Sequence, residues 1–170
     1  TNNQEYLSIK PQYQSDYSVY VPIMTGCDNF CSYCAVPYTR GREISRSEQD
    51  ILQEIKGLVK AGYKEITLLG QNVNSYRFGF VKLLEKIDAI SDDHWLRFYA
   101  NHPKDFGDDL IDFLKNSKHF CHYIHLPLQS GDDEILKNMN RHYTAEQYLE
   151  IIKKIREEIP DCAITTDIIV

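Results

Sequence analysis

The chain has 170 residues, of which 42% are hydrophobic, and this length fits a single domain with a sizeable core. Its net charge of −6 argues against strong, sequence-independent nucleic-acid binding by this chain alone, because such binders are usually basic. With neither an apolar run of roughly 20 residues nor a signal-peptide core, we expect a cytoplasmic protein without membrane contact, in a compartment that keeps thiols reduced.

Strand and helix patterns alternate along the chain. The first strand is predicted at 18–24, and Pro22 favours an edge position because proline donates no ladder hydrogen bond. Ser47 with Asp50, and Thr144 with Gln147, predict capped helix starts. Further strands are predicted at 65–70, 95–100, 121–128 and 163–170, and helices at 47–62, 80–90, 107–117, 132–140 and 144–159.

This alternation predicts an α/β fold with a parallel sheet. Because there is no hairpin signal, we expect the strands to lie in sequence order with the helices on the convex face. Trp95 is expected to belong to the core. The extended, polar residues 1–17 resemble a linker from an upstream domain. Residues 18–170 would form the core, and the apolar strand at the end of the chain suggests that this core continues further.

Polar side chains follow every predicted strand. Active sites of parallel α/β barrels lie at the carboxyl ends of the strands, so we expect these side chains to gather at one edge. Any single loop could be polar without a function, but their joint placement with three thiols indicates a site. The residues are Cys27, Cys31 and Cys34 after the first strand, Gly70, Gln71, Asn72 and Asn74 after the second, Asn101 and His102 after the third, Gln129, Ser130 and Gly131 after the fourth, and Asp167 in the fifth.

The three clustered cysteines have the spacing C-x3-C-x2-C within the sequence GCDNFCSYCAVPYTRG, residues 26–41. Thiolates are the usual protein ligands of iron–sulfur clusters, and four irons held by three cysteines leave one iron for a small molecule. A zinc site would need a fourth ligand from a distant histidine, and a disulfide plus a free thiol is disfavoured in a reducing compartment. The spacing favours a cluster and leaves zinc open.

This spacing, with the aromatic Tyr33 directly before the last cysteine and a strand directly before the loop, resembles the radical SAM superfamily. The resemblance implies a 4Fe-4S cluster on Cys27, Cys31 and Cys34 whose open iron chelates S-adenosylmethionine. Reductive cleavage would then give a 5′-deoxyadenosyl radical. It also implies an open, partial (β/α)6 barrel, here truncated after the fifth strand.

Four stretches, the first of which contains the cysteine segment, are similar to the methylthiotransferases of this superfamily: GCDNFCSYCAVPYTRGREISR, LLGQNVNSY, LPLQSGDDEILKNMNRHYT and ITTDIIV. VPYTRG and GQNVNSY resemble the MiaB-type enzymes, which add a methylthio group to C2 of N6-isopentenyladenosine beside the tRNA anticodon. Related enzymes that act on ribosomal protein S12 or on threonylcarbamoyl-adenosine are the alternative. A non-catalytic zinc- or RNA-binding module is the alternative of another class.

The resemblance also implies partners. Family members carry an upstream domain with an auxiliary 4Fe-4S cluster and a downstream TRAM domain that grips tRNA, and neither is present in these 170 residues. We therefore expect the isolated chain to be inactive in the full reaction. The partners implied for the whole enzyme are tRNA and an electron donor such as flavodoxin or ferredoxin, with the protein acting as a monomer.

Several residues receive cofactor-binding roles from the resemblance. Gly70, Gln71 and Asn72 occupy the place of the motif that contacts the methionyl amino group, with a plain strand-end turn as the alternative. Arg141 would pair with the cofactor carboxylate, since guanidinium groups suit carboxylates, or else form a surface salt bridge. Gln129 and Ser130 would contact the ribose or the carboxylate of the cofactor, with a helix cap as the alternative. Asp167 would contact the ribose hydroxyls or, alternatively, a polar group of a neighbouring strand. Tyr33 would lie beside the cluster and the adenine.

Other conspicuous side chains are given simpler expectations. Cys121 and Cys162 are expected to be small buried residues. His119, His122 and His125 recur at three-residue spacing, but on a strand they would face different sides. A substrate-phosphate contact or a solvated basic loop is expected for Tyr38, Arg40, Arg42 and Arg46.

Overall fold

The main sheet is parallel, as the sequence predicts. The computed structural model describes residues 6–170 except for residues 8, 10, 91 and 92, so the predicted linker 1–17 lies partly outside the described residues. The sheet contains β1 (Ser18–Pro22), β4 (Glu65–Leu69) and β5 (Trp95–Phe98) in that order. Val19, Ile66 and Leu96 stand side by side in register, and Pro22 lies on the edge strand as expected.

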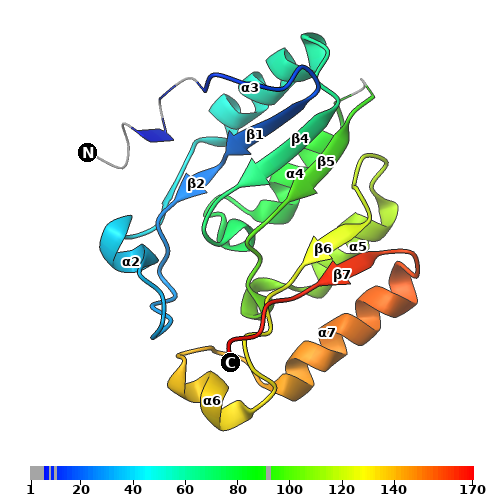
Figure 1. Ribbon diagram of the computed structural model, residues 1–170. Coiled ribbons are helices and arrows are strands. Elements are labelled where there is room, and N and C mark those ends of the chain that lie inside the picture. Colours follow the sequence, from blue (N-terminus) through cyan, green and yellow to red (C-terminus); the bar gives the residue numbers. More distant parts are fainter. Residues whose placement is uncertain (1–5, 8, 10, 91–92) are drawn as a thin grey trace.

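Two more parallel strands extend this arrangement. β6 (Tyr123–His125) pairs with β7 (Ala163–Thr165), and a parallel bridge between Leu96 and Phe120 joins β5 to the segment before β6. The five strands therefore follow one another in sequence order, which confirms the predicted topology (Figure 1). β6 is shorter than the predicted strand 121–128, which contains Pro127, a residue without a donor for the ladder.

The long helices lie next to one another in chain order, α3 (Glu48–Lys60), α4 (Phe80–Asp88), α5 (Asp108–Asn116) and α7 (Ala145–Glu158). Figure 1 shows α3 and α4 behind the strands of the main sheet. The predicted apolar faces are buried: Leu83, Leu84 and Ile87 of α4 have no exposed surface. This packing contributes about 1.5–3 kcal/mol for each large side chain that leaves water.

Both predicted helix starts are confirmed. The Ser47 hydroxyl accepts the N–H of Asp50 at 3.2 Å before α3. Before α7, Thr144 and Gln147 bond reciprocally, each side chain accepting the other's backbone N–H at 3.2 and 2.9 Å. Shorter helical segments are α2 (Val36–Thr39), α6 (Asp133–Asn138), η1 (Val73–Ser75) and η2 (Pro103–Asp105).

A small antiparallel ribbon was not expected from the sequence. β2 (Met24–Thr25) pairs with β3 (Ile44–Ser45), so the end of the predicted first strand leaves the main sheet. The prediction missed this ribbon because its strands are two residues long and are separated by the whole cysteine segment, so no local turn marks it. The ribbon closes the base of that segment.

No helix among the described residues is long and apolar enough to cross a membrane.

The prediction that Trp95 belongs to the core is wrong. Trp95 is 58% exposed, whereas Phe98 on the same strand is 2% exposed. Side chains alternate between the two faces of a strand, and the even-numbered positions Leu96 and Phe98 take the face that packs on the helices.

This placement predicts that Phe98→Ala lowers the free energy of unfolding by about 3–5 kcal/mol, as for other buried aromatic residues. Trp95→Ala is expected to cost about 1 kcal/mol or less, as for exposed positions. Urea unfolding followed by circular dichroism measures both without relying on tryptophan fluorescence. Equal losses for the two variants would contradict the exposed position of Trp95.

Candidate functional site

The three clustered cysteines lie on residues 26–43, the cysteine loop, which leaves the end of β2 and returns in β3. Cys27 and Cys31 are 8% and 7% exposed, and Cys34 is half-buried. The loop has internal order: the N–H of Cys27 bonds the carbonyl of Gly41 at 3.2 Å, and the N–H of Cys34 bonds that of Cys31 at 2.9 Å. Burial raises the pKa of the Cys27 thiol. All five cysteines of the chain are free, which does not support the disulfide alternative.

The first turn of the cysteine loop requires a glycine. Gly26 has φ of +79°, and a Cβ atom there would lie 2.2 Å from the carbonyl oxygen of Arg42. Its N–H donates to Oε1 of Gln71 at 2.7 Å, which ties the loop to the residue that follows β4. A side chain at position 26 would therefore separate the two ends of the loop.

The thiols line a cavity of about 330 Å³. As the sequence predicts, the ends of all five parallel strands contribute to it: the cysteine loop follows β1 by way of β2, and polar residues at the ends of the other strands line the same cavity. Arg141 from the segment between α6 and α7 completes the wall. The polar side chains of the lining are Cys27, Asn29, Cys31, Tyr33, Cys34, Gln71, Asn101, His102, His125, Gln129, Arg141 and Asp167.

Three predicted cofactor contacts lie outside this lining. Gly70 packs against Met24, with no room for a Cβ atom beside that side chain. Asn72 is buried, and its amide nitrogen donates to Asp105 at 2.8 Å. The Ser130 hydroxyl accepts the N–H of Asp132 at 3.2 Å, whereas the helix cap that was its alternative is formed by Asp132, whose side chain accepts the N–H of Ile135 at 2.9 Å. Their cofactor roles stay predictions.

Arg141 stands between the thiols and two tyrosines. Its Nη1 lies 3.5 Å from Cys31 Sγ and 3.4 Å from the Tyr33 hydroxyl, and its Nε donates to the Tyr143 hydroxyl at 3.0 Å. Burial raises the pKa of Tyr33 to about 12 against the opposing effect of Arg141, so Tyr33 is protonated near neutral pH.

Asn101 and His102 each bring to the cavity a buried polar atom that has no hydrogen-bond partner among the described residues. The amide nitrogen of Asn101 donates to the carbonyl of His125 at 3.1 Å, and its buried Oδ1 has no partner among the described residues. His102 Nδ1 accepts the N–H of Lys104 at 3.3 Å, and burial, followed by the charges of Arg141 and Lys104, lowers the pKa of His102 to about 3. The ring is therefore neutral with its proton on Nε2, which is buried and also lacks a partner in the described structure.

His125 and Asp167 form a second pair in the lining, with His125 Nε2 3.3 Å from Asp167 Oδ2. His125 was not predicted as a site residue. The available signal was its position at the end of the fourth strand, directly before LPLQSG. The other two histidines of the three-residue series do not line the cavity: the ring of His119 stacks on that of His94 with 4.0 Å between the ring centroids, and His122 contacts Asp161 at 2.8 Å. Cys162 is buried as expected, whereas Cys121 is half-buried.

The donor set fits a cluster better than a single ion. Within the described part of the chain, no group of three or more His, Cys, Asp or Glu side chains is arranged to hold one metal ion. A structural zinc requires four ligands that converge on one point. An iron–sulfur cluster presents several irons, so its thiolates are spread around the cluster instead, and three thiols that line one cavity suit that arrangement.

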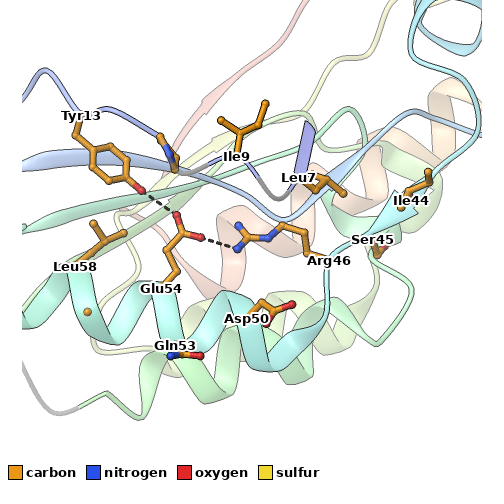
Figure 2. A pocket seen from close by; sticks show the side chains of 12 residues that line it. Leu7, Ile9, Tyr13, Ile44, Ser45, Arg46, Asp50, Gln53, Glu54 and Leu58 are labelled. Carbon is orange, nitrogen blue, oxygen red and sulfur yellow. Dashed lines mark hydrogen bonds and ion pairs between the residues drawn. The ribbon is translucent and has the colours of Figure 1, made fainter. Parts of the chain in front are cut away.

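The basic residues after the cysteines do not form one phosphate-binding group. Arg46 is half-buried in an ion pair with Glu54 at 2.7 Å, and Glu54 also accepts the Tyr13 hydroxyl at 2.9 Å (Figure 2). These groups line a separate cavity of about 800 Å³ between the N-terminal segment and α3. Arg42 pairs with Asp28 at 2.9 Å on the surface. The phosphate contact expected of Arg46 is therefore wrong, because its guanidinium serves the fold.

The family model described as the Radical SAM superfamily matches residues 21–170. This chain belongs to the radical SAM superfamily. Membership implies a 4Fe-4S cluster and S-adenosylmethionine as cofactors, in agreement with the thiol-lined cavity. Among solved structures, the chain resembles the radical SAM methyltransferase TsrM from Kitasatospora setae with a TM-score of 0.70 and 20% identity, covering 89% of this chain and 30% of that one. The cobalamin-dependent radical SAM enzyme OxsB gives 0.72 at 13% identity, over 89% and 24% of the two chains.

Closer relatives share half of the sequence. The chain is 53% identical over 163 residues to a tRNA-2-methylthio-N(6)-dimethylallyladenosine synthase of Clostridium perfringens strain SM101, covering 92% of this chain and 36% of the relative. The synthase of the same name from Clostridium botulinum strain Eklund 17B is 56% identical with the same coverage. This radical SAM chain thus spans about a third of the length of these curated relatives.

The glycine at the start of the cysteine loop allows a matched pair of variants. Gly26→Ala should destabilise the protein by more than about 1–2 kcal/mol, since it adds a steric overlap to a left-handed backbone. Gly57→Ala, in the exposed interior of α3 with open space around its Cβ position, should stabilise by about 0.5–1 kcal/mol. Thermal and urea unfolding measure both, and a neutral Gly26→Ala would contradict the loop geometry.

The neutral state of His102 predicts a pH dependence. Its pKa is lowered on folding from 6.5 to about 3, so between these values the unfolded chain binds a proton that the folded protein does not. Stability should fall as the pH drops through this window, by up to about 1.4 kcal/mol per pH unit from this residue. Urea unfolding of His102→Gln between pH 4 and 7 should show a shallower slope than the parent protein. Parallel slopes would mean that His102 is protonated in the fold.

Proposed function

We propose that this chain is the radical SAM core of a tRNA methylthiotransferase that adds a methylthio group to C2 of N6-isopentenyladenosine at position 37, beside the anticodon. The observation that supports this most is 53–56% identity over 92% of the chain to synthases named for that product. The thiol-lined cavity supports the same assignment, because it unites cysteines, a buried arginine and amide side chains at the strand ends.

Cys27, Cys31 and Cys34 hold the 4Fe-4S cluster in this proposal. When bound, the cluster supplies the electron for reductive cleavage of S-adenosylmethionine and one iron without a protein ligand. The chain's own contribution is enclosure: Cys27 and Cys31 are more than nine-tenths buried, so water has little access to the reactive centre.

The remaining lining residues bind S-adenosylmethionine. The Gln71 side chain can use its amide N–H groups for the methionyl end while its oxygen holds Gly26. Asp167, held beside His125 and largely exposed, suits ribose hydroxyls, and the aromatic Tyr33 suits the adenine. Gln129 contacts the ribose and carboxylate region, and Arg141 offers it a single N–H because its other four already bond protein acceptors. Gly70, Asn72 and Ser130 act through the turns that place their neighbours.

His102 and Asn101 extend this binding surface. A protonated Nε2 and a bare Oδ1, both buried beside the cavity, form a donor and an acceptor that have no hydrogen-bond partner among the described residues. Leaving such groups unpaired costs about 1–3 kcal/mol each, which a polar ligand can offset. Adenine carries both functions on its edge and fits this pair.

The proposal includes the partners that the family resemblance implies. Residues 1–17 link to an upstream domain with the auxiliary cluster, and flavodoxin or ferredoxin supplies electrons in the cytoplasm to a monomeric enzyme. The charge of −6 gives this chain little affinity for phosphates, so other domains provide most of the grip on tRNA.

The first test is anaerobic reconstitution with iron and sulfide, which should give about one 4Fe-4S cluster per chain. The triple variant Cys27→Ala, Cys31→Ala, Cys34→Ala should hold no cluster, whereas Cys121→Ala, at a half-buried cysteine outside the loop, should hold as much as the parent. Iron and acid-labile sulfide analysis measures this. A stoichiometric cluster in the triple variant, or one zinc per parent chain, would reject the assignment.

The second test addresses the substrate with a chimera. Residues 18–170 replace the matching segment of the Clostridium perfringens synthase, and tRNA nucleosides from a host lacking its own synthase are analysed by mass spectrometry. We expect methylthiolated isopentenyladenosine from the chimera and none when it carries Cys31→Ala. A folded chimera with its cluster but without this product would point to another methylthiotransferase substrate.

A further inference from the structure

A segment more than a hundred residues away in the sequence closes over the cysteine loop. Residues 139–141, between α6 and α7, contact residues 29–33, and we call them the clasp. The N–H of Ser32 donates to the carbonyl of Met139 at 3.1 Å. The amide of Asn140 donates to the carbonyls of both Asn29 and Phe30 at 3.0 Å.

The clasp holds strained backbone on both sides. Phe30 and Asn140 have φ of +48° and +58°, a left-handed conformation that is unfavourable for phenylalanine and tolerated by asparagine. Such a conformation persists only where neighbouring contacts enforce it. The two carbonyls captured by Asn140 are those of Asn29 and Phe30, so the clasp explains how this turn of the loop is kept in place.

Arg141, the third clasp residue, donates a hydrogen bond to the sulfur of Cys31. Arg141 is 8% exposed and makes four side-chain hydrogen bonds to protein acceptors: Nε to Tyr143, Nη1 to Cys31 Sγ and to Tyr33, and Nη2 to the carbonyl of Pro127 at 3.2 Å. A guanidinium has five N–H groups. A two-pronged grip on a cofactor carboxylate would therefore break bonds that already exist.

We infer that Arg141 is a positioning residue that donates a charged hydrogen bond to the Cys31 thiolate and thereby raises the reduction potential of the cluster on the loop, with Asn140 holding the loop in register. This inference rests on the proposed function. Reduction adds negative charge to the cluster, and a buried cation with an N–H···S bond stabilises that charge. Without Arg141 the cluster should be harder to reduce.

The potential is measured on protein reconstituted with iron and sulfide, by redox titration monitored by electron paramagnetic resonance without S-adenosylmethionine. Omitting that molecule separates the effect from any contact with its carboxylate. We expect the midpoint potential of R141M to be more negative than that of the parent and that of R141K to lie between them. R156M is the matched control, because Arg156 bonds the carbonyl of Cys162 at 2.7 Å, outside the cysteine loop, and its potential should equal the parent's.

A second measurement tests the clasp without any cluster. Asn140→Gly keeps the left-handed backbone but removes both amide bonds, so Cys31 should be alkylated about tenfold faster in the apo protein. Peptide mass spectrometry gives the rate at each cysteine, with Cys162 as the internal reference. An unchanged rate at Cys31 overturns the clasp.

An unchanged potential in R141M and R141K at normal cluster content overturns the inference for Arg141. Should R141M bind no cluster, the comparison of R141K with the parent decides in the same way. A parent protein that binds no cluster at all rejects the proposed function instead, while the alkylation rates still test the clasp.

Discussion

The common direction of the five strands is the constraint on which the rest of the structure depends. Val19, Ile66 and Leu96 lie in register across three of them, and each helix returns the chain to the start of the next strand. Every strand must then end at the same edge. The cysteines, Gln71 and the residues after β5, β6 and β7 meet there although they are spread over most of the chain.

The order of the cysteine loop comes from its surroundings more than from its own sequence. Gln71 holds its first turn through Gly26, the β2–β3 ribbon closes its base, and residues 139–141 cover its middle. Holding the thiols in a buried position before the cofactor binds costs free energy, because burial disfavours their charged form, as the raised pKa of Cys27 shows. Metal binding offsets such a cost, which couples folding of the loop to its cofactor.

The polar groups around the cavity divide into two kinds. Arg141 is satisfied by protein acceptors and so has a structural part, whereas the buried Nε2 of His102 and Oδ1 of Asn101 have no partner within the described chain. Unsatisfied buried groups lower stability, and proteins retain them where function requires it. The same reasoning removes Arg46 from the functional residues, because Glu54 and the carbonyl of Pro22 already satisfy it.

The sequence by itself determined the strand order, the helix caps at Ser47 and Thr144, and the three-cysteine loop, because these depend on local patterns and on one rule of parallel sheets. It placed Trp95 wrongly, since a hydrophobic residue at the start of a strand does not reveal which face of the sheet packs on the helices. Only the tertiary structure decided that Arg46 pairs with Glu54, that His125 lines the cavity beside Asp167, and that Asn140 and Arg141 close over the cysteines. Those contacts join residues up to 111 positions apart, and no local pattern encodes such a distance.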